Sequence, residues 1–366
     1  IIVSPPVTLE RSLFVSIKID GMVRVAAATP HVKVADCPYN KNEMAKMIRE
    51  AAANGASVIA FPELAMTGYT CGDLFKDRKL MESAKACLFD LIEETEDLDI
   101  LCAVGMPIPS GGALYNCAAV FSRGVLLGLP AKQHIPNYSE FYELRHFSPA
   151  PESGMLRYAG DWYGCRDVVF ELAPDVTVGV EICEDMWTPL PPSTFLALNG
   201  AEVILNLSAS NETIGKRAYR RGLVQHQSAA LNCVYAYCSA GSTESTQDLI
   251  FSGQSLIGED GRLLAETEEP IASDYMLVCD CDLGRIRADR MKNKGFKDAA
   301  QQNPGHPAVL VDTNAPELRG DGMRYPLAKL PFVPTGKENR VRRCMEIFHM
   351  QVAGLKQRLS ILGSAK

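Results

Sequence analysis

The sequence predicts an α/β protein in which two β-sheets are covered by helices. Short apolar runs rich in Val, Ile and Ala alternate along the chain with segments of helical periodicity. Hairpin-like pairs of strands are mixed with crossovers, which favours layered sheets with helices outside them. The chain has 366 residues, 47% hydrophobic and 22% charged, which permits a large core and excludes a disordered chain.

The first predicted strand is 22–29 (MVRVAAAT), and the helical segment NEMAKMIREAAANG after it should end at Gly55. Further strands, recognised by their Val, Ile and Ala content, are expected at 57–62, 100–106, 114–122, 176–183, 201–208, 233–240 and 275–282. Further helices are expected at about 76–96, 193–199 and 213–232. No repeat of 20–50 residues occurs, which excludes solenoids and propellers.

The composition changes after about residue 295, where Pro and Gly recur and only one short strand-like run is found. This stretch is interpreted as an interdomain linker that ends in a helix at about 338–362. Apolar residues recur every three or four positions in that helix, at Val341, Cys344, Phe348, Val352, Leu355, Leu359 and Leu362. The stripe needs a partner surface, and the main domain and another domain or subunit are equally good candidates.

Charge and cysteine content limit the class of protein. The net charge is -7 and no dense basic run occurs, so no nucleic-acid partner is expected. The opening stretch 1–21 has no unbroken apolar segment and is typical of neither a signal peptide nor a membrane span. The twelve cysteines are spread over a long chain, which favours a reducing compartment, and we expect a cytoplasmic protein.

The spacing of the cysteines does not indicate a metal site. The closest pairs are Cys279 with Cys281 and Cys233 with Cys238, and neither has the CxxC spacing of a zinc site. No metal is therefore expected. Alternation within YMLVCDCD instead places Cys279 and Cys281 on one strand face, where burial accounts for them.

Cys183 is the cysteine best placed to act as a nucleophile. It ends the strand-like run VTVGVEIC, and the chain then turns into a helix, so the side chain should be exposed near backbone N–H groups that favour a thiolate. A histidine is the first candidate for its base. None of the six histidines lies in a recognised cysteine-protease signature: His31, His134, His146, His226, His306 and His349.

A carboxylate is the other possible base. Glu63 directly follows the strand SVIAFP, and Lys132 ends the strand-like stretch VLLGLPAK. Each residue alone is more easily explained as a solvated loop residue. Together with Cys183, however, they place Glu, Lys and Cys at three strand ends, in this chain order.

The sequence motifs around these residues resemble those of the nitrilase superfamily. FPELAMTGY matches the family's glutamate block, the Lys132 segment its lysine block and VGVEICEDMW its cysteine block. More narrowly, TGYTCGDLF, LPAKQHIPNYSEFYELRHF and ILNLSASNETIGKRAYRR resemble the glutaminase domain of glutamine-dependent NAD+ synthetases, a likeness that runs from about Met22 to the end. The resemblance implies a nitrilase-like α-β-β-α sandwich.

The resemblance also implies a mechanism, namely hydrolysis of the glutamine side-chain amide through a thioester on Cys183. Glu63 would act as general base and acid, and Lys132 would bind the oxyanion together with the Glu184 N–H. Glu143 would orient the lysine, a role for which Glu140 is the weaker candidate.

The residues implied to surround the free amino acid are Tyr69, Tyr138, Phe141, Glu184, Ser210 and Lys216. Lys216 stands where some relatives carry arginine, and a lysine cannot bind a carboxylate bidentately. Its alternative is a lysine on a helix surface. The resemblance also places Ser139 and Phe141 at the entrance of a tunnel through which ammonia would leave the site.

The resemblance divides the chain into an extension at 1–21, a glutaminase domain at 22–295 and a linker with a helix at 296–366. The helix would lead to an ATP-dependent synthetase domain, whose SGGxDS loop is absent from the printed sequence. No cofactor is expected for this chain, and ATP and Mg2+ are expected only for that domain. The resemblance also implies a homo-oligomer. The alternatives are a stand-alone amidase or carbamoyl hydrolase of the same superfamily, and a nonhydrolytic assembly domain, against which the complete Glu, Lys and Cys set argues.

Overall fold

The structure is a computed structural model that describes residues 20–173, 176–244, 249–268, 273–303, 305, 309–314, 322–327, 330, 332–334 and 336–363. The chain divides into two compact units, Ile1–Arg324 and Tyr325–Lys366. The first unit contains both large sheets and every candidate site residue. The second contains one long helix.

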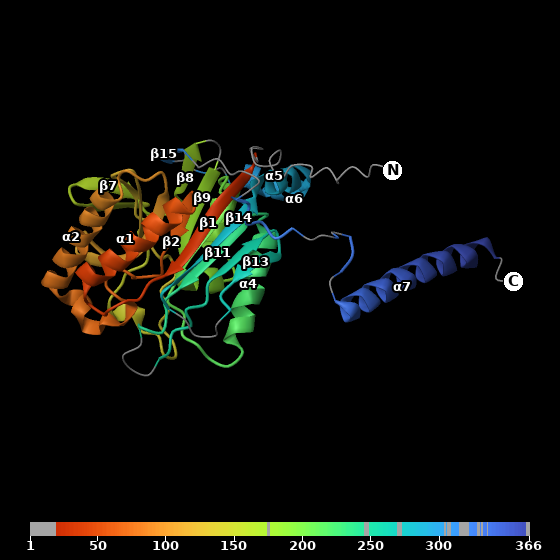
Figure 1. Cartoon of the computed structure of the whole chain (residues 1–366), viewed down its shortest axis with the longest axis horizontal. Helices are drawn as coiled ribbons and strands as arrows, with labels where there is room; N and C mark the ends of the chain where they lie inside the picture. The colour runs from red at the N-terminus through yellow and green to blue at the C-terminus, as the bar shows by residue number, and fades with distance from the viewer. Residues whose placement is uncertain are drawn as a thin grey trace, which may run out of the picture. The chain divides into compact units, whose positions relative to one another are not determined.

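Among the described residues, the strands form two large sheets and a hairpin (Figure 1). The first sheet has the order β14 (Tyr275–Asp282), β1 (Met22–Thr29), β2 (Val58–Ala60), β3 (Leu101–Ser110), β4 (Ala113–Ser122), β5 (Val125–Gly128). The second has the order β13 (Arg262–Glu266), β12 (Leu256–Glu259), β11 (Val234–Ser239), β10 (Val203–Ser208), β9 (Val176–Ile182), β8 (Val169–Ala173), β15 (Val309–Asn314). The hairpin is β6 (Met155–Tyr158) with β7 (Asp161–Gly164).

Helices α1 (Cys37–Ala53), α2 (Arg78–Glu94), α3 (Pro192–Leu198) and α4 (Lys216–Ala230) cover the outer faces of the two sheets. Helices α5 (Leu283–Lys292) and α6 (Lys294–Gln302) follow β14, and α5 buries Leu283 and Ile286 in the core between the sheets. Helices α1 and α2 share a core with the first sheet, and α3 and α4 share one with the second. A third core, between the two sheets, combines side chains from both. These layers confirm the predicted α-β-β-α arrangement.

Strand β1 shows how the sequence builds these layers. Val23, Val25 and Ala27 face the second sheet, whereas Ala26 and Ala28 face the helices. Successive side chains of a strand point to opposite faces, so a strand buried on both faces must be apolar throughout. The same alternation places Cys279 and Cys281 of β14 together between the sheets, as predicted.

Local signals in the sequence set the ends of the first two helices. The Asp36 side chain accepts a hydrogen bond from the Tyr39 N–H at 3.2 Å and begins α1. Asp77 begins α2 in the same way, through the Lys79 N–H at 2.7 Å. Gly55 has φ +75° just beyond the end of α1, which confirms it as the predicted stop, because glycine adopts this backbone conformation without steric cost.

The predicted strands and helices are present, with ends that differ by a few residues. The helix expected at about 213–232 is shorter, since α4 begins at Lys216 and ends at Ala230. Strands β6, β7, β8, β12 and β13 and helices α5 and α6 were not identified from sequence. The strand-like run after residue 295 forms β15, which pairs in parallel with β8.

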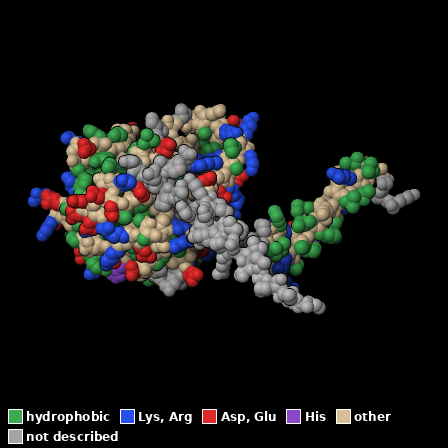
Figure 2. Space-filling model, turned by 45° about the horizontal axis from the view of Figure 1, so that its top comes forward, with side chains coloured by type: hydrophobic (Ala, Val, Ile, Leu, Met, Phe, Trp, Pro, Cys, Tyr) green, Lys and Arg blue, Asp and Glu red, His purple; other side chains and the backbone are tan. Residues whose placement is uncertain are grey.

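Helix α7 (Lys337–Leu362) belongs to the second unit. None of its described residues is buried within the chain. Figure 2 shows hydrophobic side chains along its visible surface, and the predicted stripe is exposed, for example Phe348 at 55% and Leu355 at 59%. Across the described residues, no helix combines the length and apolar character needed to span a membrane.

Candidate active site

Glu63 lies three residues beyond the end of β2, in the turn that leads to 3-10 helix η1 (Tyr69–Lys76). Its side chain is completely buried. The Asn116 Nδ2 donates to Glu63 Oε1 at 2.6 Å, and the Ala209 N–H donates to Glu63 Oε2 at 2.9 Å. The donors come from β4 and from the end of β10, so the carboxylate is held by both sheets.

Gly105 in β3 makes room for this turn. A Cβ built at Gly105 would lie 2.3 Å from the Pro62 carbonyl oxygen and 2.3 Å from the Leu64 N. Only glycine therefore permits the Glu63 segment to cross β3 so closely. Leu64 itself has φ +54°, which is uncommon for a residue with a branched side chain.

Lys132 lies between two carboxylates. Its Nζ donates to Glu63 Oε1 at 2.7 Å and to the two oxygens of Glu143 at 2.8 and 2.9 Å. Glu143 begins 3-10 helix η2 (Glu143–Arg145) and is 5% exposed, and Lys132 is completely buried. The Tyr69 hydroxyl donates to Glu143 Oε1 at 2.7 Å, so this carboxylate is held on both sides.

Cys183 follows β9 directly and begins 3-10 helix η3 (Cys183–Trp187). Its φ of +47° is sparsely populated for a non-glycine residue, and such backbone conformations concentrate at functional sites. The sequence predicted an exposed thiol here. The side chain is instead only 7% exposed, because the ends of the neighbouring strands enclose the turn.

The electrostatics of this set follow from its burial. Burial raises the pKa of the Cys183 thiol, and Glu63 raises it further. The predicted thiolate is therefore not the resting state, and the thiol needs a base. Burial raises the pKa of Glu63 to about 7, opposed by Lys132 and supported by Glu143. Burial opposes the charge on Lys132, but Glu143 and Glu63 outweigh it and raise the pKa of the ammonium well above its usual value.

Four of the predicted substrate-binding residues lie around this set, Glu184 and Tyr69 in the 3-10 helices η3 and η1 and Tyr138 and Phe141 in a loop. Glu184 follows Cys183 and is half-buried, and its carboxylate accepts from the Tyr138 hydroxyl at 2.8 Å. Burial raises the pKa of Glu184. Phe141 lies in the Tyr138 loop, with its ring centroid 6.1 Å from that of Tyr138. Tyr69 is partly exposed, and its hydroxyl contacts Glu143.

The other two, Ser210 and Lys216, lie beyond β10 and at the start of α4. The Lys216 Nζ lies 5.8 Å from the Phe141 ring centroid and 5.5 Å from that of Trp187, and it donates to Asn211 Oδ1. Burial lowers the pKa of this half-buried amine. The Ser210 hydroxyl accepts from Arg220 Nη1 at 3.2 Å. Lys216 therefore faces the Phe141 loop and is not a solvated helix-surface lysine.

Three neighbours of the site were missed from sequence. Asn116 and Arg220 are completely buried, and Glu140, considered only for the Glu143 role, accepts from Asn211 Nδ2 at 2.5 Å. A polar residue inside the apolar strand LYNCAAVFS was a usable signal for Asn116. Nothing in the sequence distinguishes Arg220 from the other basic residues of α4, because its burial depends on Ser210 and Gln254 from distant segments.

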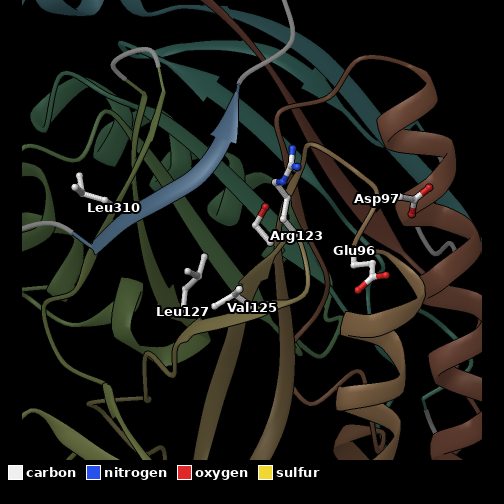
Figure 3. Close-up of a pocket in the computed structure, with 7 residues that line it drawn as sticks. Glu96, Asp97, Arg123, Val125, Leu127 and Leu310 are labelled. Carbon is white, nitrogen blue, oxygen red and sulfur yellow. The ribbon is translucent and has the colours of Figure 1, made fainter.

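A separate pocket lies at the opposite end of the first sheet (Figure 3). Its lining residues come from the end of α2, the β4–β5 turn and β15: Glu96, Asp97, Ser122, Arg123, Val125, Leu127 and Leu310. Arg123 pairs with Asp99 at 2.6 Å. None of the candidate site residues lines this pocket. Among the described residues, no cluster of three His, Cys, Asp or Glu side chains could hold a metal ion.

Comparison with known proteins bears on the family and the fold of this chain. The family model described as carbon-nitrogen hydrolase matches residues 24–291. The glutamine-dependent NAD(+) synthetase of Mycobacterium tuberculosis is 37% identical over 357 residues, which cover 94% of this chain and 52% of the relative. The Homo sapiens protein of the same name is 28% identical, over 79% of this chain and 42% of the relative. The chain thus spans about half the length of these curated relatives.

Solved structures show the same fold. The glutamine-dependent NAD(+) synthetase from Cytophaga hutchinsonii superposes with a TM-score of 0.62 at 28% identity, over 71% of this chain and 43% of that one. An amidase from Nesterenkonia sp. superposes with a TM-score of 0.57 at 19% identity, over 76% of this chain and 98% of that one. The second likeness bears on the fold alone.

Proposed function

The chain belongs to the carbon-nitrogen hydrolase family, and from this premise we propose that it hydrolyses the side-chain amide of glutamine to glutamate and ammonia through a thioester on Cys183. One observation carries the proposal. A buried Lys132 ammonium is hydrogen-bonded to Glu63 and Glu143, in a site where Glu63 also raises the pKa of the Cys183 thiol. This arrangement supplies a nucleophile, a base and a fixed positive charge.

In the first half of the reaction, Glu63 accepts the proton of the Cys183 thiol, and the sulfur attacks the carboxamide carbon of glutamine. The charge that develops on the carboxamide oxygen is neutralised by Lys132 Nζ and the Glu184 N–H. Glu63 then returns the proton to the departing ammonia. A carboxyl with a pKa of about 7 can act in both directions near neutral pH.

In the second half, water attacks the thioester carbonyl carbon while Glu63 accepts its proton. The tetrahedral intermediate collapses, the Cys183 sulfur recovers its proton from Glu63, and glutamate leaves with a new carboxyl group that loses its proton to solvent. Glu143 takes no proton in this scheme. It keeps the Lys132 ammonium charged and aligned through two hydrogen bonds.

Recognition of the amino acid rests on the loops around the site. We propose that the Glu184 carboxylate binds the α-ammonium and that Lys216, with the Ser210 hydroxyl, binds the α-carboxylate. Tyr138, Phe141 and Tyr69 would flank the aliphatic stem. The contacts of Tyr138 with Glu184 and of Lys216 with the Phe141 ring support this grouping, because they place both charges beside one loop.

We further propose that the ammonia serves a synthetase domain that amidates deamido-NAD to NAD, with ATP and Mg2+ used only there. The names of the relatives support this, as does the share of their length that this chain covers. In this proposal residues 22–295 would form the glutaminase domain and residues 296–366 the connection, and the synthetase domain would cover the apolar stripe of the helix. We also propose a homo-oligomer in the cytoplasm, where the twelve free cysteines would stay reduced.

The test is ammonia release from glutamine, asparagine and simple aliphatic amides, measured with a coupled glutamate dehydrogenase assay. We expect glutamine to have the highest kcat/KM. A preference for the simple amides would assign the chain to stand-alone amidases, and release from a carbamoyl compound would assign it to carbamoyl hydrolases. A nonhydrolytic assembly domain would turn over none of them. Trapping the thioester with glutamine and detecting it by mass spectrometry on Cys183 would identify the nucleophile.

A further inference from the structure

Asp185 connects the chain segments that carry two of the site residues. It lies in η3, two residues after Cys183, and its side chain is 1% exposed. Oδ1 accepts from the His134 N–H at 2.8 Å and from the Gln133 N–H at 3.1 Å, and Oδ2 accepts from the Ile182 N–H at 3.1 Å. Gln133 follows Lys132, and Ile182 precedes Cys183.

The donors to this carboxylate are mostly main-chain groups. Three backbone N–H groups point at Asp185, and the imidazole Nδ1 of His134 lies 3.0 Å from Oδ1. Hydrogen bonds to an ionised carboxylate are about twice as strong as those between neutral groups. The buried Asp185 carboxylate thus fixes both the backbone that follows Lys132 and the backbone that precedes Cys183.

We propose that Asp185 is a positioning residue. It holds the Lys132 ammonium and the backbone at Cys183–Glu184 in fixed positions relative to each other, so that both contact the same oxyanion. The proposal deepens the proposed function and rests on it. Lys132 contributes the charge and Glu184 the N–H, but they belong to different sheets, and an error of an ångström between them would weaken both contacts. Asp185 touches neither the substrate nor the sulfur in this scheme.

The test separates oxyanion binding from thiol reactivity. Alkylation of Cys183 by iodoacetamide needs the thiol and its base but develops no oxyanion, whereas amide hydrolysis needs all of them. The isosteric variant Asp185→Asn should lower kcat for glutamine by about tenfold to a hundredfold with KM within threefold, since oxyanion contacts act on the chemical step. The rate of Cys183 alkylation, followed by peptide mass spectrometry, should stay within threefold of the wild type.

Glu202→Gln is the matched control. Glu202 is a buried carboxylate that binds Arg287 at 2.5 and 2.8 Å, and it lies just before β10, at the end of that strand opposite the site. The Glu202→Gln variant should lower the melting temperature as much as Asp185→Asn does. Its kcat should stay within about twofold of the wild-type value, because distant sites act independently.

Several results would overturn the positioning role. They are an unchanged kcat in folded Asp185→Asn, a parallel loss of kcat and alkylation, and a kcat loss in the Glu202 control as large as in the variant.

If Asp185→Asn does not fold, His134→Ala takes its place. It removes one contact and keeps the backbone donors, so it should lower kcat about threefold at unchanged alkylation, and an unchanged kcat would reject the proposal. If the wild type hydrolyses other amides but not glutamine, the substrate assignment fails, and the same comparison is made with the amide that it accepts. A wild type that hydrolyses no amide overturns both proposals.

Discussion

Replacing Glu143 with Gln tests the electrostatic basis of the site. The variant keeps the shape of the side chain but removes one of the two negative charges beside Lys132. A hydrogen bond to a charged group contributes about 1.5–3 kcal/mol, and if that amount is lost only in the transition state, kcat falls about tenfold to a hundredfold. KM should change little, because Glu143 does not contact the substrate in the proposed scheme.

The pH dependence of the same variant gives a signed prediction. In the wild type, kcat/KM should fall as the pH drops through about 7, because protonated Glu63 cannot accept the thiol proton. The charge on Glu143 raises the pKa of Glu63, so its removal lowers that pKa. The acid limb of Glu143→Gln should therefore lie at lower pH than that of the wild type.

The assay is ammonia release from glutamine between pH 5 and 9, with thermal unfolding recorded for each variant. Glu94→Gln is the control, because Glu94 binds Lys41 at 2.5 Å in another lysine–glutamate pair, between α1 and α2. Its acid limb should not move. An acid limb that stays in place or moves to higher pH in Glu143→Gln would refute the assigned coupling of Glu143 to Glu63.

Four further predictions concern single residues. Cys183→Ala should abolish turnover, checked by ammonia release, and lower stability by only about 1 kcal/mol, because one buried sulfur is removed; Cys344→Ala should do neither. Lys132→Ala should reduce kcat at least a hundredfold. Because Lys132 lowers the pKa of Glu63, its removal moves that pKa further above the usual 4.5. The melting temperature of the Lys132→Ala variant should therefore fall more than that of the wild type as the pH rises from 5 to 8. Lys216→Ala should raise KM for glutamine about tenfold but not KM for a simple amide, which has no carboxylate to bind. Gly105→Ala should lower the melting temperature and the activity together, because its Cβ would meet the Glu63 turn; an unaffected variant would refute the steric argument.

The two carboxylates next to Lys132 illustrate what the sequence could predict. The matching motif words identified Glu63, Lys132 and Glu143, and the sequence favoured Glu143 over Glu140 for the contact with the lysine. In the structure Glu143 contacts Lys132, whereas Glu140 contacts Asn211. The choice was possible because the motif words define a position in the chain. The chemistry of an isolated glutamate does not.

The state of Cys183 could not be predicted in the same way. The end of a strand followed by a turn indicated an exposed and ionised thiol, but the burial of the side chain and the neighbouring Glu63 raise its pKa. A pKa depends on solvent access and on charges that come from distant parts of the chain. Neither quantity is encoded in the few residues around the cysteine.

The sequence by itself determined the layered α/β class, the strand ends at which the site forms and the family to which those ends belong, because periodicity and motif words are local properties. Only the tertiary structure decided that Glu63 is held by donors from both sheets, that Gly105 admits its turn and that Asp185 joins the Lys132 and Cys183 segments. These contacts join residues up to 146 positions apart. The contact of Ala209 with Glu63 and the contacts of Asp185 with residues 133–134 join segments of different sheets, so they arise only when the two sheets pack face to face.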